Sequence, residues 1–329
     1  MIELLIIALA VLAYALVSRR LARSPVTAPM FFTTVGLVVG AGGLGWFDVS
    51  IENETTTILV EATLVLVLFT DAIRINLRVL RRQAALPGRL LGIGMPLTIA
   101  AGAWAALLIV PGLNLVEAAL LAAVLAPTDA ALGQAVVSDQ RLPARVRQTL
   151  NVESGLNDGI AVPVVTVLLT VAIAESAGGA GDWVGLAVQQ VGFGLLAGVG
   201  CGAVGGWLLD RRAAAHEVEG VYRQLAAISI AVAAYGLAGV VGGNGFVAAF
   251  TAGLAFGHVA RAHCEGVQDF SEDEGELLSA ITFVIFGAVL AGPVLGDLTW
   301  QLAAALGDTA SCYGRVDRQQ LLDQRRHVL

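Results

Sequence analysis

The stretch "LAPTDAALGQAVV", Leu125 to Val137, decides how the chain is built. It places Asp129 two residues after Pro127 in the middle of a segment apolar enough to lie in lipid. An ionisable side chain inside a bilayer is costly, so it normally faces a bundle interior or a wet cavity and marks a path for ions, protons or substrate. The stretch therefore predicts a membrane helix that carries a functional site.

The rest of the chain is equally apolar. Its 329 residues are 57% hydrophobic and 14% charged, and its mean hydropathy is +0.79, far above the values of a soluble domain. Apolar runs that can cross a hydrocarbon core of about 30 Å recur along most of the sequence. Because lipid offers backbone groups no partners and the runs are too long for barrel strands, the sequence predicts an all-α membrane protein, a polytopic helix bundle.

We expect ten membrane helices and the start of an eleventh near residue 297. Their predicted ranges are 2–18, 26–46, 56–73, 89–110, 114–137, 146–175, 183–209, 221–241, 244–259 and 276–295. The first is interpreted as a helix and not as a signal peptide, because it lacks a basic start and a small-residue cleavage site. The glycine-rich run from Gly192 to Gly206 predicts close helix packing. The polar stretch from Arg261 to Leu278 predicts a surface loop with a short amphipathic turn.

The charges alternate along this series of helices. All 19 basic residues are arginines, and apart from those in the C-terminal tail they all follow odd-numbered predicted helices. The connections after even-numbered helices carry acids instead, such as Asp48, Glu52, Glu175 and Asp182. By the positive-inside rule, the odd connections are cytoplasmic and the N-terminus lies outside.

The fifth predicted helix is expected to be interrupted at Pro127. The proline ring removes one backbone hydrogen bond and frees a carbonyl, and such breaks persist only where they face protein or water. Freed carbonyls together with Thr128 and Asp129 form a set of hard oxygen ligands for a small cation. This chemistry suits sodium better than any soft metal, while potassium and lithium remain alternatives.

The sixth predicted helix carries "NVESGLNDGIAVP", Asn151 to Pro163. Glu153 and Asn157 are four residues apart and share a helix face, and Ser154 and Asp158 share the neighbouring face. One wall of this helix therefore presents two carboxylates, an amide and a hydroxyl at membrane depth.

If this wall faces the break at Pro127, Asp129 and Asp158 approach each other. Two carboxylates in a poorly solvated cavity are expected to retain a proton near neutral pH, which a cation can displace. The simpler alternative is that an acid in the membrane only pairs with an arginine or a backbone group, and for Glu153 both interpretations stay open. Glu61 and Asp71 are expected to be residues at helix ends.

These motifs resemble the monovalent cation:proton antiporter family, in particular the NhaP-like sodium/proton exchangers. The resemblance rests on "APTD" at 126–129 and "VESGLNDGIAVP" at 152–163, with further matches at 36–48, 66–82 and 283–293. It implies an antiporter fold of thirteen helices in two inverted repeats, with the N-terminus outside and usually a homodimer. It also implies a cation held by residues matching Thr128, Asp129, Ser154 and Asp158. Asn157 stands where electrogenic relatives carry a second aspartate, which implies electroneutral exchange.

The C-terminal end departs from this family pattern. Hydrophobic periodicity stops after about Ala303, so we expect a transmembrane domain over 1–305 and a polar, disordered tail over 306–329 that is not native to the family. The second inverted repeat is then incomplete, and the tail resembles the product of a frameshift or early stop. On this interpretation the chain has weak or absent exchange activity.

Taken together, the sequence predicts a secondary transporter of the plasma membrane and not an enzyme. The expected partners are a monovalent cation, the proton, the lipid bilayer and a second copy of the chain, with no cofactor and no nucleic acid. Two alternatives remain. One is an intramembrane aspartyl protease that uses Asp129 and Asp158 as a dyad, in which Ser154, Asn157 and Pro127 have no evident task. The other is a remnant that does not transport.

Overall fold

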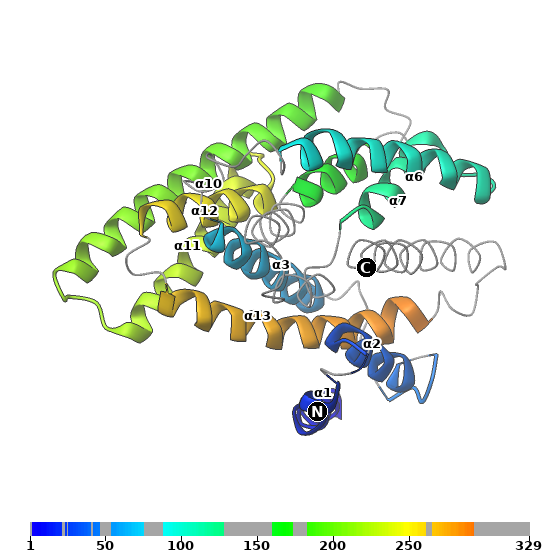
Figure 1. Ribbon diagram of the computed structural model, residues 1–329, viewed down its shortest axis with the longest axis horizontal. Helices are drawn as coiled ribbons and strands as arrows, with labels where there is room; N and C mark the ends of the chain where they lie inside the picture. Colours follow the sequence, from blue (N-terminus) through cyan, green and yellow to red (C-terminus); the bar gives the residue numbers. More distant parts are fainter. Residues whose placement is uncertain are drawn as a thin grey trace, which may run out of the picture.

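The computed structural model describes residues 2–21, 24, 26–40, 42–46, 54–75, 88–127, 160–173, 183–260 and 265–292. Apart from short turns, these residues are helical, and no strand occurs among them. The elements are α1 (Ile2–Leu21), α2 (Ala28–Val39), α3 (Glu54–Arg74), η1 (Leu90–Gly94), α6 (Met95–Ile109), α7 (Leu115–Leu125), the 160–173 helix (Ile160–Ile173), α10 (Trp183–Ala214), α11 (Gly220–Val240), α12 (Gly245–Val259), α13 (Glu265–Ile285) and η3 (Phe286–Ala291). The prediction of an all-α polytopic bundle is confirmed (Figure 1).

Each of the ten predicted spans overlaps a helix in the described part of the chain, although 128–137 of the fifth span and 146–159 of the sixth lie outside the described residues. Six of these helices are long and apolar enough to cross a membrane, and four further apolar helices are shorter. The clearest correction concerns the predicted loop between Arg261 and Leu278. Most of it belongs to α13, which begins at Glu265 and continues without a break into the membrane span. The predicted tail over 306–329 and the domain boundary before it lie outside the described residues.

Local signals set where several helices begin. Asn114 caps α7, because its side chain accepts a hydrogen bond from the Glu117 amide while the Glu117 carboxylate accepts one from the Asn114 amide. This reciprocal pair satisfies two backbone donors that a helix start otherwise leaves free. A proline stands in the first turn of both α2 and α6, where its missing amide hydrogen costs nothing.

Glycines let α10 and α12 pack backbone against backbone, and the two helices lie side by side in Figure 1. Four glycines on one face of α10 are spaced four residues apart, and a Cβ atom added to any of them would meet α12. From one glycine to the next, the residue that it meets also advances by four positions. The pairs are Gly194 with Asn244, Gly198 with Ala248, Gly202 with Ala252 and Gly206 with Phe256. The predicted small-residue packing of this run is confirmed, and the constant register shows that the two helices run parallel.

The same type of contact fixes the direction of other helices. Gly253 and Gly257 of α12 lie against Phe69 and Ile73 of α3, so these helices are also parallel. In contrast, α13 runs antiparallel to α3, because Thr282 bonds Thr63 while Gly275 lies near Val67. Counted among the ten spans, α3, α10 and α12 are the third, seventh and ninth, and they share one direction. The tenth span, α13, runs in the other direction, as ten successive crossings require.

Large apolar side chains cover the outside of the bundle. On α1, five leucines are between 55% and 78% exposed: Leu4, Leu5, Leu9, Leu12 and Leu16. In water such a surface would drive aggregation, whereas against lipid tails it needs no cover. The exposed face of α1 is that of a helix surrounded by lipid.

Candidate functional site

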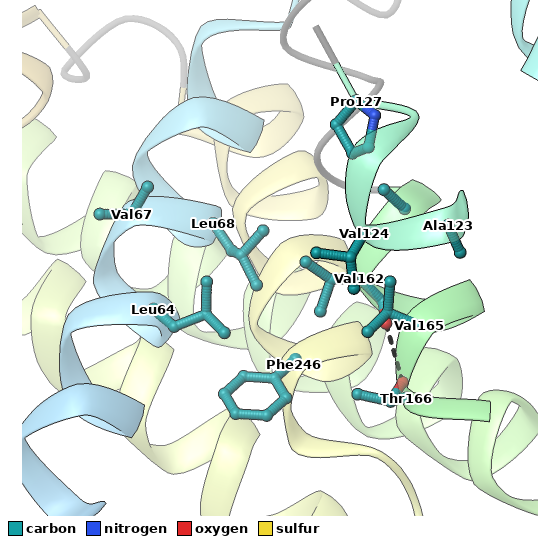
Figure 2. A pocket seen from close by; sticks show the side chains of 11 residues that line it. Leu64, Val67, Leu68, Ala123, Val124, Pro127, Val162, Val165, Thr166 and Phe246 are labelled. Carbon is teal, nitrogen blue, oxygen red and sulfur yellow. Dashed lines mark hydrogen bonds between the residues drawn. The ribbon is translucent and has the colours of Figure 1, made fainter. Parts of the chain in front are cut away.

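A cavity of about 310 Å³ lies where α3, α7, the 160–173 helix and α12 meet. Its walls are almost entirely aliphatic (Figure 2). The lining residues are Leu64, Val67, Leu68, Ala123, Val124, Pro127, Ala161, Val162, Val165, Thr166 and Phe246. Pro127 and Phe246 lie at opposite ends of this group in Figure 2.

Two of the lining residues stand next to the predicted ion-binding motifs. The helix α7 ends at Leu125, and Pro127 follows it immediately before Thr128 in the sequence. On the other side of the cavity, Ala161 belongs to the first turn of the 160–173 helix and follows Asp158 by three residues. Both segments that carry predicted ligands are therefore continuous in sequence with residues that line the same cavity.

The predicted ligands themselves lie outside the described residues. These are Thr128, Asp129, Ser154, Asn157 and Asp158, together with Glu153, for which a structural and a functional role both stay open. Pro127 is the one predicted site residue that the structure describes, and it is partly buried in the cavity wall. The end of α7 just before Pro127 agrees with an interruption of the fifth span at this point.

The described wall of the cavity is a barrier and not a binding shell. Its only side chain with a hydrogen-bonding group is Thr166, whose hydroxyl donates to the carbonyl oxygens of Val162 and Pro163. That hydroxyl also accepts a hydrogen bond of 2.9 Å from the Asn244 Nδ2 group. Aliphatic side chains offer a cation no oxygen ligands, so the described wall alone cannot bind a cation.

Asn244 holds the 160–173 helix against the glycine-packed helices. Its Oδ1 atom accepts from the amides of Phe246 and Val247 and so caps α12, while its Nδ2 group donates to Thr166. Its own amide donates to the Gln190 carbonyl of α10 over 2.8 Å. One side chain and its backbone thus join three helices, a role the sequence analysis did not foresee. The sequence does hold a signal for the capping role, because an asparagine directly before an apolar run is a typical N-cap.

A second acid inside the membrane was misjudged from the sequence. Glu61 was predicted to lie at a helix end, but it lies about two turns inside α3. Its Oε2 atom accepts a hydrogen bond of 2.8 Å from the Tyr235 hydroxyl of α11. The other acid of this helix, Asp71, lies in the last turn of α3, as predicted.

An aromatic contact connects this acid to the cavity. The ring of Tyr235 packs against the ring of Phe246, with centroids 5.5 Å apart and planes inclined by 55°. Gly245 has no room for a side chain because a Cβ atom there would overlap the Tyr235 ring. Phe246 therefore lines the cavity on one side and contacts the partner of Glu61 on the other.

The arrangement defines a polytopic helical membrane protein with a cavity between packed helices. Two residues of its lining, Pro127 and Ala161, stand next to the two polar motifs in the sequence. Residues 7–316 match the family model described as sodium/hydrogen exchanger, transmembrane, and the chain belongs to this family. Its relatives are secondary transporters, and the match gives no support to the alternative of an intramembrane protease.

Individual relatives agree with this assignment. The chain is 27% identical over 294 residues to the Na(+)/H(+) antiporter 2 of Zygosaccharomyces rouxii, covering 83% of this chain and 36% of that protein. It is 29% identical over 303 residues to the K(+)/H(+) antiporter NhaP of Alkalimonas amylolytica, covering 90% of this chain and 51% of that protein. The chain thus spans about a third to a half of the length of these relatives.

The fold also resembles that of a solved structure. The sodium proton antiporter MjNhaP1 from Methanocaldococcus jannaschii superimposes with a TM-score of 0.70 at 19% sequence identity, over 88% of this chain and 72% of that one. At this identity the likeness concerns the fold alone.

Proposed function

We propose that the protein exchanges a monovalent cation, sodium or potassium, for a proton across the plasma membrane. The observation that carries this proposal is the shared cavity, which has Pro127 in one wall and Ala161 in another. Each of these residues borders a motif with hard oxygen ligands, which suit a small cation. The family membership and the names of the relatives support the same chemistry.

Covalent geometry supports a common site for the two motifs. Consecutive Cα atoms are about 3.8 Å apart, so two residues span at most about 8 Å and three at most about 11 Å. Asp129 is two residues from Pro127, and Asp158 is three residues from Ala161. Both acids then belong near one cavity, where they would share a cation or a proton.

The proposed mechanism is competition at this site. Asp158 binds either a proton or a cation, and Asp129, Thr128, Ser154 and freed carbonyls complete the cation shell. Asn157 contributes no charge, so one positive charge moves each way and exchange is electroneutral. Glu153 serves as a structural acid of the same helix. Alternating access then carries the loaded site from one side of the membrane to the other.

The wider setting belongs to the proposal as well. The arginines after odd spans place those connections in the cytoplasm and the N-terminus outside. The transporter is proposed to act as a homodimer, with the cation and the proton as substrates and no cofactor.

Binding of sodium tests this proposal on the 329-residue chain. A ligand that binds the folded protein raises its thermal unfolding midpoint in proportion to the logarithm of ligand concentration. We expect sodium to stabilise the purified protein at alkaline pH, and we expect this stabilisation to shrink as the pH falls because protons occupy the site. Asp158→Asn should abolish the sodium effect, and Glu219→Gln, an exposed acid without a side-chain cap bond, should keep it.

Exchange itself provides the second measurement. Everted membrane vesicles with a pH-sensitive dye should show proton release on addition of sodium or potassium. The release should be weak if the second repeat is incomplete, and the Asp158→Asn protein should show none. Cation-driven exchange that survives in this variant would refute the assignment of Asp158.

A further inference from the structure

Glu61 is an intramembrane acid that the proposed exchange does not use. It stands five residues inside the apolar window Thr56–Ile73 of α3, which corresponds to a depth of about 8 Å along the helix. A carboxylate at such a position is expensive to keep and by default indicates a function.

The partner of Glu61 leaves its charge uncompensated. Tyr235 donates one hydrogen bond of 2.8 Å to the carboxylate, but a phenol is neutral and fills only one of several acceptor positions. In the described part of the chain no arginine or histidine forms an ion pair with Glu61. The remaining lone pairs are available to a cation or to water.

The position of Glu61 relates it to the cavity. Glu61, Leu64 and Leu68 stand at i, i+3 and i+7 and therefore share one face of α3. Leu64 and Leu68 line the cavity, and the acid lies about one turn before Leu64 and two turns before Leu68. Its partner Tyr235 contacts Phe246, at the end of the cavity opposite Pro127 (Figure 2).

We propose that Glu61, held by Tyr235, is an acid on an access route of the transported cation. It attracts monovalent cations to the Phe246 end of the cavity, and the aliphatic wall with Phe246 separates it from the ion-binding motifs until the helices move. A fixed negative charge beside a passage of low dielectric raises the local concentration of cations. The proposal rests on the exchange function proposed above and adds a residue that sets the apparent affinity for the cation.

The hydrogen bond between Glu61 and Tyr235 would also be present if it only held α3 and α11 together. Two conservative substitutions separate the possibilities. Glu61→Gln removes the charge but keeps a carbonyl oxygen that can accept from Tyr235, whereas Tyr235→Phe removes the hydrogen bond but keeps the charge. A structural role follows the hydrogen bond, and a role on the cation route follows the charge.

The experiment measures the half-saturating sodium concentration of the purified 329-residue chain, at constant ionic strength with choline chloride. This concentration is obtained from the point at which the unfolding midpoint begins its logarithmic rise with sodium. The same concentration dependence is measured for exchange in proteoliposomes. We expect Glu61→Gln to raise the half-saturating sodium concentration about threefold, because loss of the negative charge lowers the local cation concentration, with the maximal exchange rate retained. Glu61→Asp should stay close to the unmodified protein, and Glu219→Gln serves as a matched control for charge loss.

Tyr235→Phe should lower the unfolding midpoint without sodium and leave the half-saturating concentration unchanged. A Glu61→Gln protein that responds to sodium like the unmodified chain would overturn the proposal. If Glu61→Gln does not fold, the half-saturating sodium concentration is measured on Glu61→Ala instead. If neither variant folds, the carboxylate is structural and the proposal is overturned. An unmodified chain that responds to sodium in neither assay would instead refute the exchange function, and this inference would fall with it.

Discussion

At the scale of single residues, Asn244 shows how one side chain can hold the 160–173 helix in place. The 160–173 helix follows the motif with Ser154 and Asp158 in the sequence. The side-chain Nδ2 group of Asn244 donates a hydrogen bond to the hydroxyl of Thr166 in this helix. The same side chain caps α12 through Phe246 and Val247. Because the capping oxygen and the bridging nitrogen are different atoms, substitutions can remove the two roles separately.

Asn244→Ala should destabilise the protein through both losses. A missing N-cap costs about 1 kcal/mol, with a range of roughly 0.5–2, and loss of the bridge to Thr166 adds to it. Asn244→Asp loses the donor to Thr166 but keeps a capping oxygen, and its negative charge is favourable at the start of α12, so it should lose less. Thermal unfolding in detergent measures the order of the three proteins. Equal midpoints for the Ala and Asp variants would contradict the separate role of the bridge.

Sequence alone could place the polar residues of the site but not their distant partners. Hydropathy marks Glu61 as an acid within an apolar run, and Pro127 as a helix breaker. Nothing along the chain connects Glu61 with Tyr235, which lies 174 residues away. That contact arises from the packing of α3 against α11, so the sequence could place Glu61 inside the span but could not show which residue it bonds.

At the scale of elements, the contact between α10 and α12 depends on the absence of side chains. Gly202 faces the Ala252 backbone, and a Cβ atom there would overlap the carbonyl oxygen. Gly200 lies two residues away on the same helix, and a Cβ atom there would meet nothing within 4 Å. Two glycines of one helix thus differ only in whether they face a neighbouring backbone.

Gly202→Ala should therefore be destabilising while Gly200→Ala should not. Overpacking a tight interface costs about 1–3 kcal/mol, whereas alanine for glycine on a free helix surface stabilises by roughly 0.5–1 kcal/mol. Thermal unfolding of the two variants and of the unmodified chain provides the comparison. A destabilised Gly200→Ala protein would show that a partner covers this face, and an unchanged Gly202→Ala protein would contradict the register of α10 and α12.

The spans could be predicted well because apolar length is a physical requirement for crossing lipid. Their ends were harder, as α13 shows. Its first turns hold Glu265, Asp269, Glu272, Asp273 and Glu274, which suggested a polar loop. A helix can continue beyond the bilayer with a polar sequence, since its backbone bonds are satisfied within the helix itself. Hydropathy detects the membrane, not the end of the helix.

At the scale of the whole molecule, two independent patterns agree on which spans share a direction. Arginines follow the odd spans in the sequence, and the packing register makes α3, α10 and α12 parallel. The start of α3 and the end of α10 therefore lie at opposite ends of the bundle. The charge pattern assigns the end with the arginines, including Arg211 and Arg212 in the last turn of α10, to the cytoplasm.

Cysteine labelling in intact cells tests this orientation. Glu54→Cys, at the exposed start of α3, should react with a membrane-impermeant maleimide added outside the cells. Ala215→Cys, in the exposed turn after α10, should react only after the cells are opened. Both variants are made in a chain without its natural cysteines, Cys201, Cys264 and Cys312, and equal labelling in detergent controls for intrinsic reactivity. The opposite pattern would invert the orientation and place Glu61 on the cytoplasmic side of the cavity. Labelling of both positions from outside would contradict the parallel arrangement of α3 and α10, on which the position of the access route depends.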